Sequence, residues 1–196
     1  MIKGKIIPRP FGHAIHANRP NQVIHYDFLY AAKPPISNGH RYQYLLVIMD
    51  DFSGFKELIP AENADHLVVV KALLHWFARF GVVPIHVSDR GSHFKNKVME
   101  ELAYRLDIKH HFCIPNLHRP NGTIECQNRE ILFVLRSLIS EMKLSFHEWT
   151  DILSMVIWAL NHCHQSSRGY PAVTLFTGLP PSRHLDVVSI SKLLSI

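Results

Sequence analysis

The chain has 196 residues, 47% of them hydrophobic, which is enough for one sizeable core, so we expect one compact domain with short tails. No apolar run reaches the roughly 18 to 20 residues that span a bilayer, and the basic start MIKGKIIPRP has no signal-peptide stretch; we therefore expect an intracellular protein. The net charge of +5 permits nucleic-acid binding without establishing it, because the charges are scattered along the chain.

The first third of the chain predicts three strands. Apolar and aromatic residues dominate segments 23–30, 42–49 and 55–59. The segments between them, 33–39 and 51–54, are rich in residue types that favour turns. This order predicts a meander of neighbouring antiparallel strands.

Helices and strands alternate in the next part of the chain. A first helix is predicted before Gly81 by apolar residues that share one helical face, Leu67, Val70, Leu73, Leu74 and Phe77. Short strands are predicted at 85–88 and 108–114. Between them, Val98, Leu102 and Leu106 indicate a second amphipathic helix.

Helices dominate the remainder. A long helix is predicted to start near Gly122 or Thr123, another to run from 146 or 149 to about 162, and a short one to follow. Together with the preceding elements, they predict an α/β fold in which a mixed, five-stranded sheet is flanked by helices.

Three acidic residues lie where predicted elements could bring them together. Asp27 is inside the first strand, Asp89 ends the strand at 85–88, and Glu125 is in the first turn of the long helix. An unpaired carboxylate is costly to bury, and three converging carboxylates repel one another unless cations bind between them. Mg²⁺ and Mn²⁺ favour oxygen ligands, and two such ions about 4 Å apart can promote phosphoryl transfer.

The spacing of these acids is specific. Thirty-five residues separate Asp89 from Glu125, and the chain here resembles the catalytic core of retroviral and retrotransposon integrases, whose motif is Asp, Asp, 35 residues, Glu. The local sequences agree: HYDF, LVIMDDFSGF, VSDRGSHF, RPNGTIECQNRE and the closing segment WALNHCHQSSRGYPAVTLFTG. The chain is most similar to elements of the gypsy type.

This resemblance carries several expectations. It implies an RNase H-like core over residues 20–186, with a lead-in at 1–19 and a tail at 187–196. It implies Asp27, Asp89 and Glu125 as catalytic ligands of two Mg²⁺ or Mn²⁺ ions. It also implies 3′-end processing and strand transfer on double-stranded DNA, core dimers, and a place in the nucleus as part of a polyprotein or preintegration complex.

Four neighbours of the acids are candidate DNA-binding residues. Asn121 and Gly122 resemble the family's mobile active-site loop, although a turn that leads into the helix explains them equally well. Asn128 and Arg129 follow Glu125 by three and four residues and share its helical face. We expect Arg129 to contact phosphate, and Asn128 to contact phosphate or a base edge.

Other polar residues are better explained by structure. A tight turn accounts for Asp50 and Asp51. Glu130 lies one residue beyond Arg129, which shares the helical face of Glu125, and one residue turns the side chain by about 100° around the helix, so Glu130 is not expected to join the three acids. Two groups complete this set: His110, His111, Cys113 and His118, which lack a zinc-site spacing, and Trp76, Trp149 and Trp158, which fit apolar helical patterns.

Two departures from the family pattern keep other functions open. The zinc module and the downstream DNA- or chromatin-binding domain of full-length relatives are not found in these residues. Cys126 also stands where gypsy-type relatives often carry Arg. Besides an active integrase core, the sequence therefore allows a truncated or domesticated DNA-binding or assembly module without efficient catalysis, or a related RNase H-like nuclease.

Overall fold

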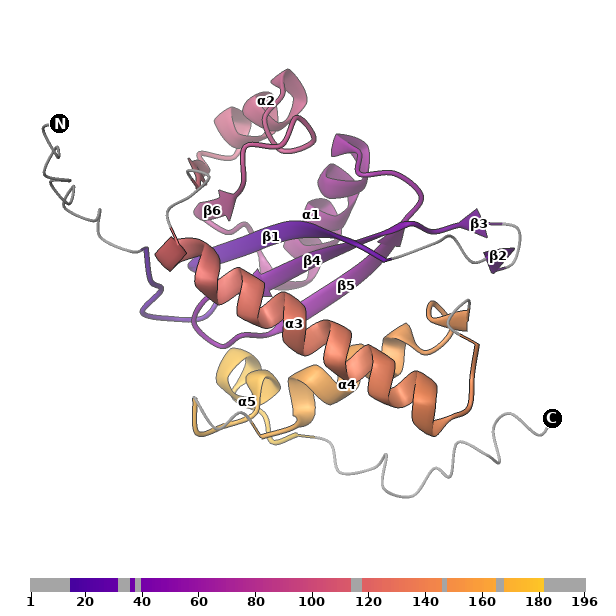
Figure 1. Ribbon diagram of the computed structural model, residues 1–196. Helices are drawn as coiled ribbons and strands as arrows, with labels where there is room; N and C mark the ends of the chain where they lie inside the picture. The colour runs from indigo at the N-terminus through magenta and orange to yellow at the C-terminus, as the bar shows by residue number, and fades with distance from the viewer. Residues whose placement is uncertain are drawn as a thin grey trace, which may run out of the picture.

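A five-stranded mixed sheet forms the centre of the protein (Figure 1). The computed structural model describes residues 15–31, 36–37, 40–113, 118–145, 148–164 and 168–181, with side chains throughout except at 36–37, 40–41 and 118–126. In the order found across the sheet, the strands are β5 (Lys56–Ala61), β4 (Tyr44–Asp50), β1 (Val23–Tyr30), β6 (Ile85–Ser88) and β7 (Lys109–Phe112). The predicted mixed sheet and its five strands are confirmed.

The direction of pairing changes at β1. This strand pairs antiparallel with β4, which pairs antiparallel with β5, as the meander predicted. On its other side β1 pairs parallel with β6, and β6 pairs parallel with β7. The parallel pairing of β1 with β6 ends at His25 and Val87, and just beyond this point lie Asp27 and Asp89, which were predicted to converge.

Alternating side chains of the central strands divide the core into two halves. In β4, Leu45 and Val47 pack on the face covered by α3 (His118–Glu141) and α4 (Leu153–His162). Leu46 and Ile48 pack on the opposite face, against α1 (His66–Phe80) and α2 (Lys97–Arg105). This two-residue alternation places a helical layer on each side of the sheet, as Figure 1 shows with α3 in front and α1 behind.

Local signals explain the limits of the first helix. Asp65 caps the start of α1, because its carboxylate accepts a hydrogen bond from the Leu67 N–H at 3.4 Å. Gly81, predicted as the stop, ends it with a φ of 83°, a conformation that favours glycine. The last helix, α5 (Ala172–Thr177), returns Phe176 to this half of the core, where its ring stacks on Phe55 at 4.7 Å.

Two predicted boundaries were wrong. The α3 helix begins at His118, before the predicted start at Gly122 or Thr123. Pro120 is only its third residue, and the first turn of a helix tolerates proline because its N–H groups have no intrahelical partner. The α4 helix begins at Leu153, later than predicted. A short hairpin of β2 (Ile36–Ser37) and β3 (His40–Arg41) replaces part of the predicted turn.

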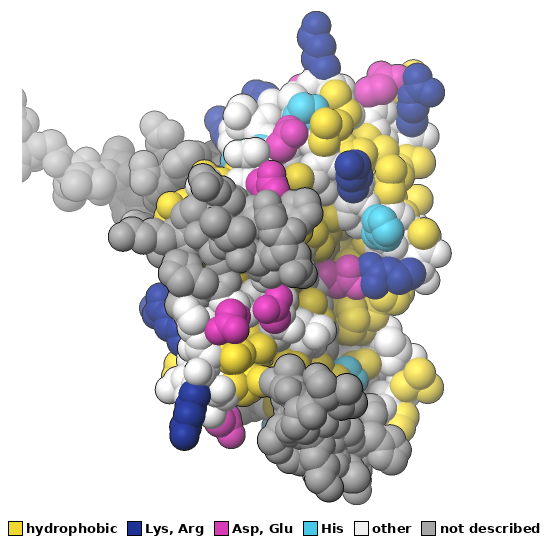
Figure 2. Space-filling model, turned by 90° about the vertical axis from the view of Figure 1, so that its right-hand side faces the viewer, with side chains coloured by type: hydrophobic (Ala, Val, Ile, Leu, Met, Phe, Trp, Pro, Cys, Tyr) yellow, Lys and Arg dark blue, Asp and Glu magenta, His cyan; other side chains and the backbone are white. Residues whose placement is uncertain are grey.

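The surface carries mixed charge. On the face in Figure 2, Lys and Arg side chains alternate with Asp and Glu, and hydrophobic side chains lie among them. Within the described part of the chain, no helix combines the length and the apolar character needed to cross a membrane.

Candidate active site

Asp27 and Asp89 lie within electrostatic reach of each other. The pairing of β1 with β6 ends at His25 and Val87, so each aspartate stands two residues beyond the last pair. Burial raises the pKa of Asp27, and the negative charge of Asp89 raises it further. The pKa of the Cys113 thiol is likewise raised by burial and then by both carboxylates. The structure thus brings together the first two predicted acids.

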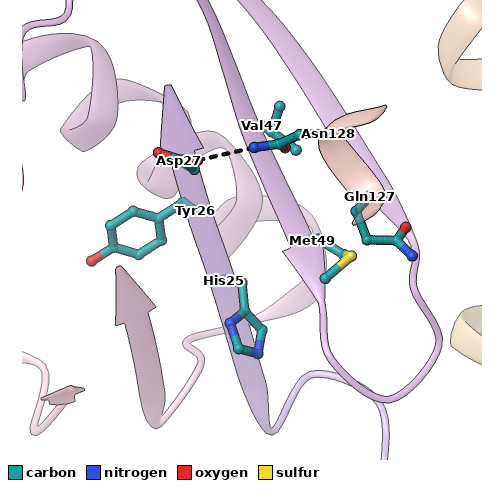
Figure 3. Close-up of a pocket in the computed structure, with 7 residues that line it drawn as sticks. All are labelled: His25, Tyr26, Asp27, Val47, Met49, Gln127 and Asn128. Atoms are coloured by element: carbon teal, nitrogen blue, oxygen red, sulfur yellow. Dashed lines mark hydrogen bonds between the residues drawn. The ribbon is translucent and has the colours of Figure 1, made fainter. Parts of the chain in front are cut away.

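Hydrogen bonds hold the Asp27 carboxylate. Its Oδ1 accepts from the Phe28 N–H at 2.8 Å, and its Oδ2 accepts from the Asn128 amide at 3.1 Å (Figure 3). Both bonds stabilise the charged form and oppose the effect of burial on the pKa. The amide N–H₂ of Asn128, a residue predicted to contact DNA, donates to Asp27, and its Oδ1 is buried without a partner among the described residues.

Asp89 is held by the turn that follows it. Its Oδ1 accepts a hydrogen bond from the Gly91 N–H at 2.8 Å, and the residue is exposed. A Cβ at Gly91 would lie 2.6 Å from the His93 ring and 3.0 Å from Asp89 Oδ1. A side chain at position 91 would therefore displace the His93 imidazole, which packs against the Gly91 backbone together with the Asp89 carboxylate.

The remaining predicted site residues lie on α3. Glu125, Asn121 and Gly122 are within this helix, but their side chains fall outside the described part, so their roles stay predictions. Arg129, one residue after Asn128, is exposed. In the stretches with described side chains, no group of three or more His, Cys, Asp or Glu is placed to hold a metal ion.

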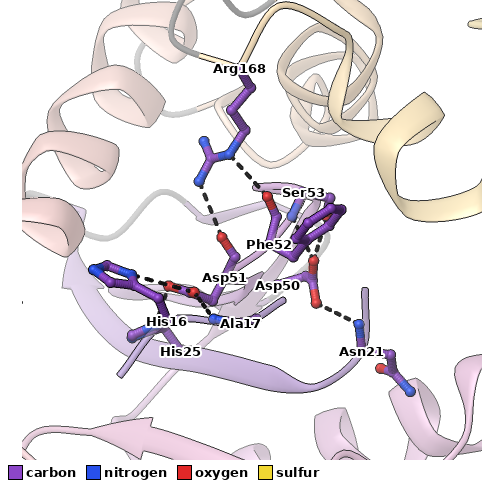
Figure 4. Close-up of polar contacts among 9 residues, drawn as sticks. All are labelled: His16, Ala17, Asn21, His25, Asp50, Asp51, Phe52, Ser53 and Arg168. Atoms are coloured by element: carbon purple, nitrogen blue, oxygen red, sulfur yellow. Dashed lines mark hydrogen bonds and ion pairs between the residues drawn. The ribbon is translucent and has the colours of Figure 1, made fainter. Parts of the chain in front are cut away.

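Asp50 and Asp51 organise a separate turn. Asp50 accepts from the N–H and hydroxyl of Ser53 at 2.8 and 2.6 Å, and from the Asn21 N–H at 2.8 Å. Asp51 contacts His25 at 2.9 Å, and Arg168 donates to two carbonyls of the same turn (Figure 4). The carboxylate of Asp50 is used by the turn, as the sequence indicated, whereas that of Asp51 contacts residues outside the turn.

The electrostatics of the two turn acids differ. Burial raises the pKa of Asp50 despite its hydrogen bonds. Burial also acts on Asp51, but hydrogen bonds from His25 and from the Ala17 N–H at 2.7 Å outweigh it and lower the pKa of that carboxyl. Asp51 therefore fixes both the chain that enters β1 and His25 within it. His25 lies two residues before Asp27, on the same face of the strand.

Glu130 also has a structural partner. Its Oε2 lies 3.3 Å from the Nζ of Lys56, a lysine with no exposed side-chain surface. Lys56 Nζ donates to the Gly54 carbonyl at 3.2 Å, while the Lys56 backbone exchanges two 2.8 Å hydrogen bonds with the Asn161 side chain. Sequence reasoning missed Lys56, although a lysine between Phe55 and the apolar part of β5 was a signal.

A buried polar network beneath the two aspartates was also missed. Tyr26 OH and Ser88 Oγ lie 3.0 and 2.9 Å from the same nitrogen, His110 Nε2. His86 borders this network, with Nδ1 3.5 Å from Tyr26 OH. Burial lowers the pKa of His86 to about 3 and that of His110 to about 4, so both rings are neutral near pH 7. The available signal was position, since Tyr26 and Ser88 directly precede the two aspartates.

The donor set at this edge fits a hard divalent cation. Two carboxylates converge there. Burial and the charge of Asp89 raise the pKa of Asp27, and a cation would relieve the repulsion between the two groups. Oxygen atoms of this type are the ligands that Mg²⁺ and Mn²⁺ prefer.

Comparison with known proteins identifies similar sequences and folds. Residues 17–117 match the family model described as integrase core domain. The chain is 31% identical over 173 residues to the Pol polyprotein of feline endogenous virus ECE1, an alignment that covers 88% of this chain and only 16% of that polyprotein. The family match ends before α3, so it does not include Glu125.

Solved structures with a similar fold include two retroviral integrase chains. One belongs to the simian T-cell lymphotropic virus intasome, with a TM-score of 0.70, 22% identity, and coverage of 90% of this chain and 60% of that one. The other is the HTLV-2 integrase catalytic core domain in complex with magnesium, with a TM-score of 0.65, 19% identity, and coverage of 82% and 99%. The expected RNase H-like fold is confirmed.

Proposed function

Because the chain belongs to the integrase core domain family, we propose that it performs metal-dependent 3′-end processing and strand transfer on double-stranded DNA. The observation that carries this proposal is the convergence of Asp27 and Asp89 just beyond the last pair of the adjacent parallel strands β1 and β6. Glu125, from α3, is proposed as the third carboxylate.

The proposed cofactor is Mg²⁺ or Mn²⁺, held as two ions by the three carboxylates. When bound, such ions activate an attacking oxygen and stabilise the leaving oxygen of a phosphodiester. Magnesium accompanies the HTLV-2 core of similar fold, which supports this choice. Neither proposed DNA reaction needs a protein nucleophile, so the protein's task is to hold charge and to orient DNA.

The residues at the site divide this task. Asp27 keeps its two oxygens oriented through the Phe28 N–H and the Asn128 amide, so its carboxylate does not need to reorganise when a ligand binds. The Gly91 N–H does the same for Asp89. Asn121, Gly122, Asn128 and Arg129 are proposed to contact DNA, and Asn128 also orients Asp27.

The wider assembly is also part of the proposal. The chain spans only 16% of the feline polyprotein, and similar chains occur in an intasome and as a dimeric HTLV-2 core. We propose a core dimer within a larger DNA complex in the nucleus.

The test is a joining assay on labelled DNA. The protein is incubated with a branched strand-transfer intermediate and Mg²⁺ or Mn²⁺, because reversal of strand transfer makes the smallest demand on flanking domains. Wild-type protein should resolve the branch only when the metal is present, and Asp89→Asn should abolish resolution. Asp107→Asn is the matched control: it is exposed before β7, at the other end of the strands, and its φ of 52° suits Asn as well as Asp.

Each outcome separates the candidate functions. Resolution that survives in Asp89→Asn would refute the assignment of the carboxylates. Salt-sensitive DNA binding without any resolution would identify a binding or assembly module instead. Metal-dependent cleavage without joining, lost in Asp89→Asn, would indicate a nuclease that uses the same site.

A further inference from the structure

Backbone pairing does not fix the separation of Asp27 and Asp89. The parallel pairs between β1 and β6 are Val23 with Ile85, Ile24 with His86 and His25 with Val87. Both aspartates lie two residues past this last pair, where the two strands share no further ladder bonds. The β1–β6 ladder therefore stops short of the two aspartates, and side-chain contacts can add to the pairing with β4 and β7 in holding them.

Side chains make the connection where the ladder stops. Tyr26 and Ser88 directly precede the two aspartates, and both lie against His110 Nε2, at 3.0 and 2.9 Å. His110 belongs to β7, where it pairs with His86 of β6, so the contact joins three strands.

The proton arrangement of this network follows from one further bond. The Ser88 hydroxyl donates to the Asp89 carbonyl at 2.9 Å, which uses its only proton. Ser88 Oγ can then only accept from His110, so Nε2 carries the hydrogen. The same N–H is shared with Tyr26 OH, and the chain of bonds runs from the His110 ring to the backbone of Asp89.

Packing makes the network rigid. Tyr26 is 1% exposed, and its ring meets Phe94 edge to face at 5.1 Å. The His110 ring packs on Phe112 at 4.2 Å. Because burial keeps the imidazole neutral, the network acts through direction and distance rather than through charge.

We propose that Tyr26, His110 and Ser88 form a bracket that sets the spacing of the Asp27 and Asp89 carboxylates for a divalent cation. The three are positioning residues: none is proposed to touch metal or DNA. This inference rests on the proposed function, since it assumes that the two carboxylates bind the cation. Groups that orient metal ligands typically change metal affinity by roughly 10- to 100-fold when they are removed.

The test measures Mn²⁺ binding to the whole chain by electron paramagnetic resonance, without DNA. Tyr26→Phe, Ser88→Ala and His110→Leu should each weaken Mn²⁺ affinity by about 5-fold or more, a smaller effect than for direct partners of a ligand. His110→Gln, whose amide nitrogen can replace Nε2, should restore most of it. Urea unfolding is measured on every variant, so that affinity refers to folded protein.

Matched controls separate the bracket from general loss of packing. Tyr30→Phe makes the same change on the same strand, at a side chain that is 59% exposed. His111→Leu makes the same change at the next residue of β7, which is exposed. Both should bind Mn²⁺ within 2-fold of wild type.

Two results would overturn the inference, and they differ. If the bracket variants lose stability but bind Mn²⁺ as wild type does, the network is structural only, and the proposed catalytic site still stands. If wild type binds Mn²⁺ no better than Asp89→Asn, the metal site itself fails, and the bracket has no ligand to position. Ser88→Ala removes a single oxygen and keeps the test decisive should the larger changes prevent folding.

Discussion

Lys56 and Glu130 form an ion pair, and we expect the loss of one partner to destabilise the protein more than the loss of the other. Lys56 has no exposed side-chain surface, whereas the Glu130 side chain is 41% exposed. Glu130→Gln leaves a buried ammonium whose described contacts reduce to the Gly54 carbonyl. Lys56→Met leaves only a carboxylate that water can reach. The glutamine variant should therefore be the less stable of the two.

The magnitude follows from this difference in exposure. Removing one partner of a fully buried ion pair costs about 3 to 5 kcal/mol, because the other charge is left uncompensated. Glu130 is partly solvated and the Gly54 carbonyl remains, so we expect about 2 kcal/mol for Glu130→Gln. Lys56→Met fills similar space with an unbranched apolar chain and should stay within about 1 kcal/mol of wild type.

Urea unfolding at pH 7 measures both variants. Tryptophan fluorescence reports the transition, since Trp76 and Trp149 are fully buried in opposite halves of the core. Glu141→Gln, an exposed change on the same helix, controls for loss of a charge. The reasoning is refuted if Lys56→Met destabilises the protein as much as Glu130→Gln while Glu141→Gln does not.

Three further changes test the site and its surroundings. Asn128→Ala removes the amide that lowers the pKa of Asp27, and should reduce branch resolution by about 10-fold with little change in unfolding midpoint. Gly91→Ala places a methyl group against the His93 ring; its resolution activity should fall below that of a Ser92→Ala control, and equal activity would contradict the contact. The pKa of His86 is about 3 in the folded protein and near 6.5 in the unfolded chain. The contribution of the neutral His86 ring to the free energy of unfolding is therefore fully present above pH 6.5 and is lost as the pH falls. From pH 6.5 to 5 the loss is about 2 kcal/mol, and urea unfolding of His86→Leu should show a correspondingly smaller pH dependence.

The sheet was largely predictable because its signals are local. The run at 23–30 is β1, and Pro84 marks the start of β6. The α3 boundary was not, since Pro120 and Gly122 usually interrupt a helix, and sequence alone did not show that Pro120 lies in the first turn. The two-residue strands of the small hairpin are too short to produce any periodic pattern.

The sequence predicted the location of those site residues whose place follows from their position along a strand or helix. Asp27 and Asp89 converge because parallel strands present their carboxyl ends at one edge. Asn128 was predicted to share the helical face of Glu125, but its contact with Asp27 spans 101 residues and depends on how α3 packs on the sheet. The contact of Tyr26 with His110 spans 84 residues, and nothing in the local sequence distinguishes either residue from other residues of the core.

The alternation of β1 explains how these two groups of contacts act on one site. His25 and Asp27 face α3, where Asn128 and the Asp51 turn hold them, whereas Tyr26 between them faces the opposite half of the core. The strand β1 thus carries the proposed ligand Asp27 on one face and one member of the bracket, Tyr26, on the other. Changes in the α1 half of the core can therefore reach the carboxylates through Tyr26 without any contact with metal or DNA.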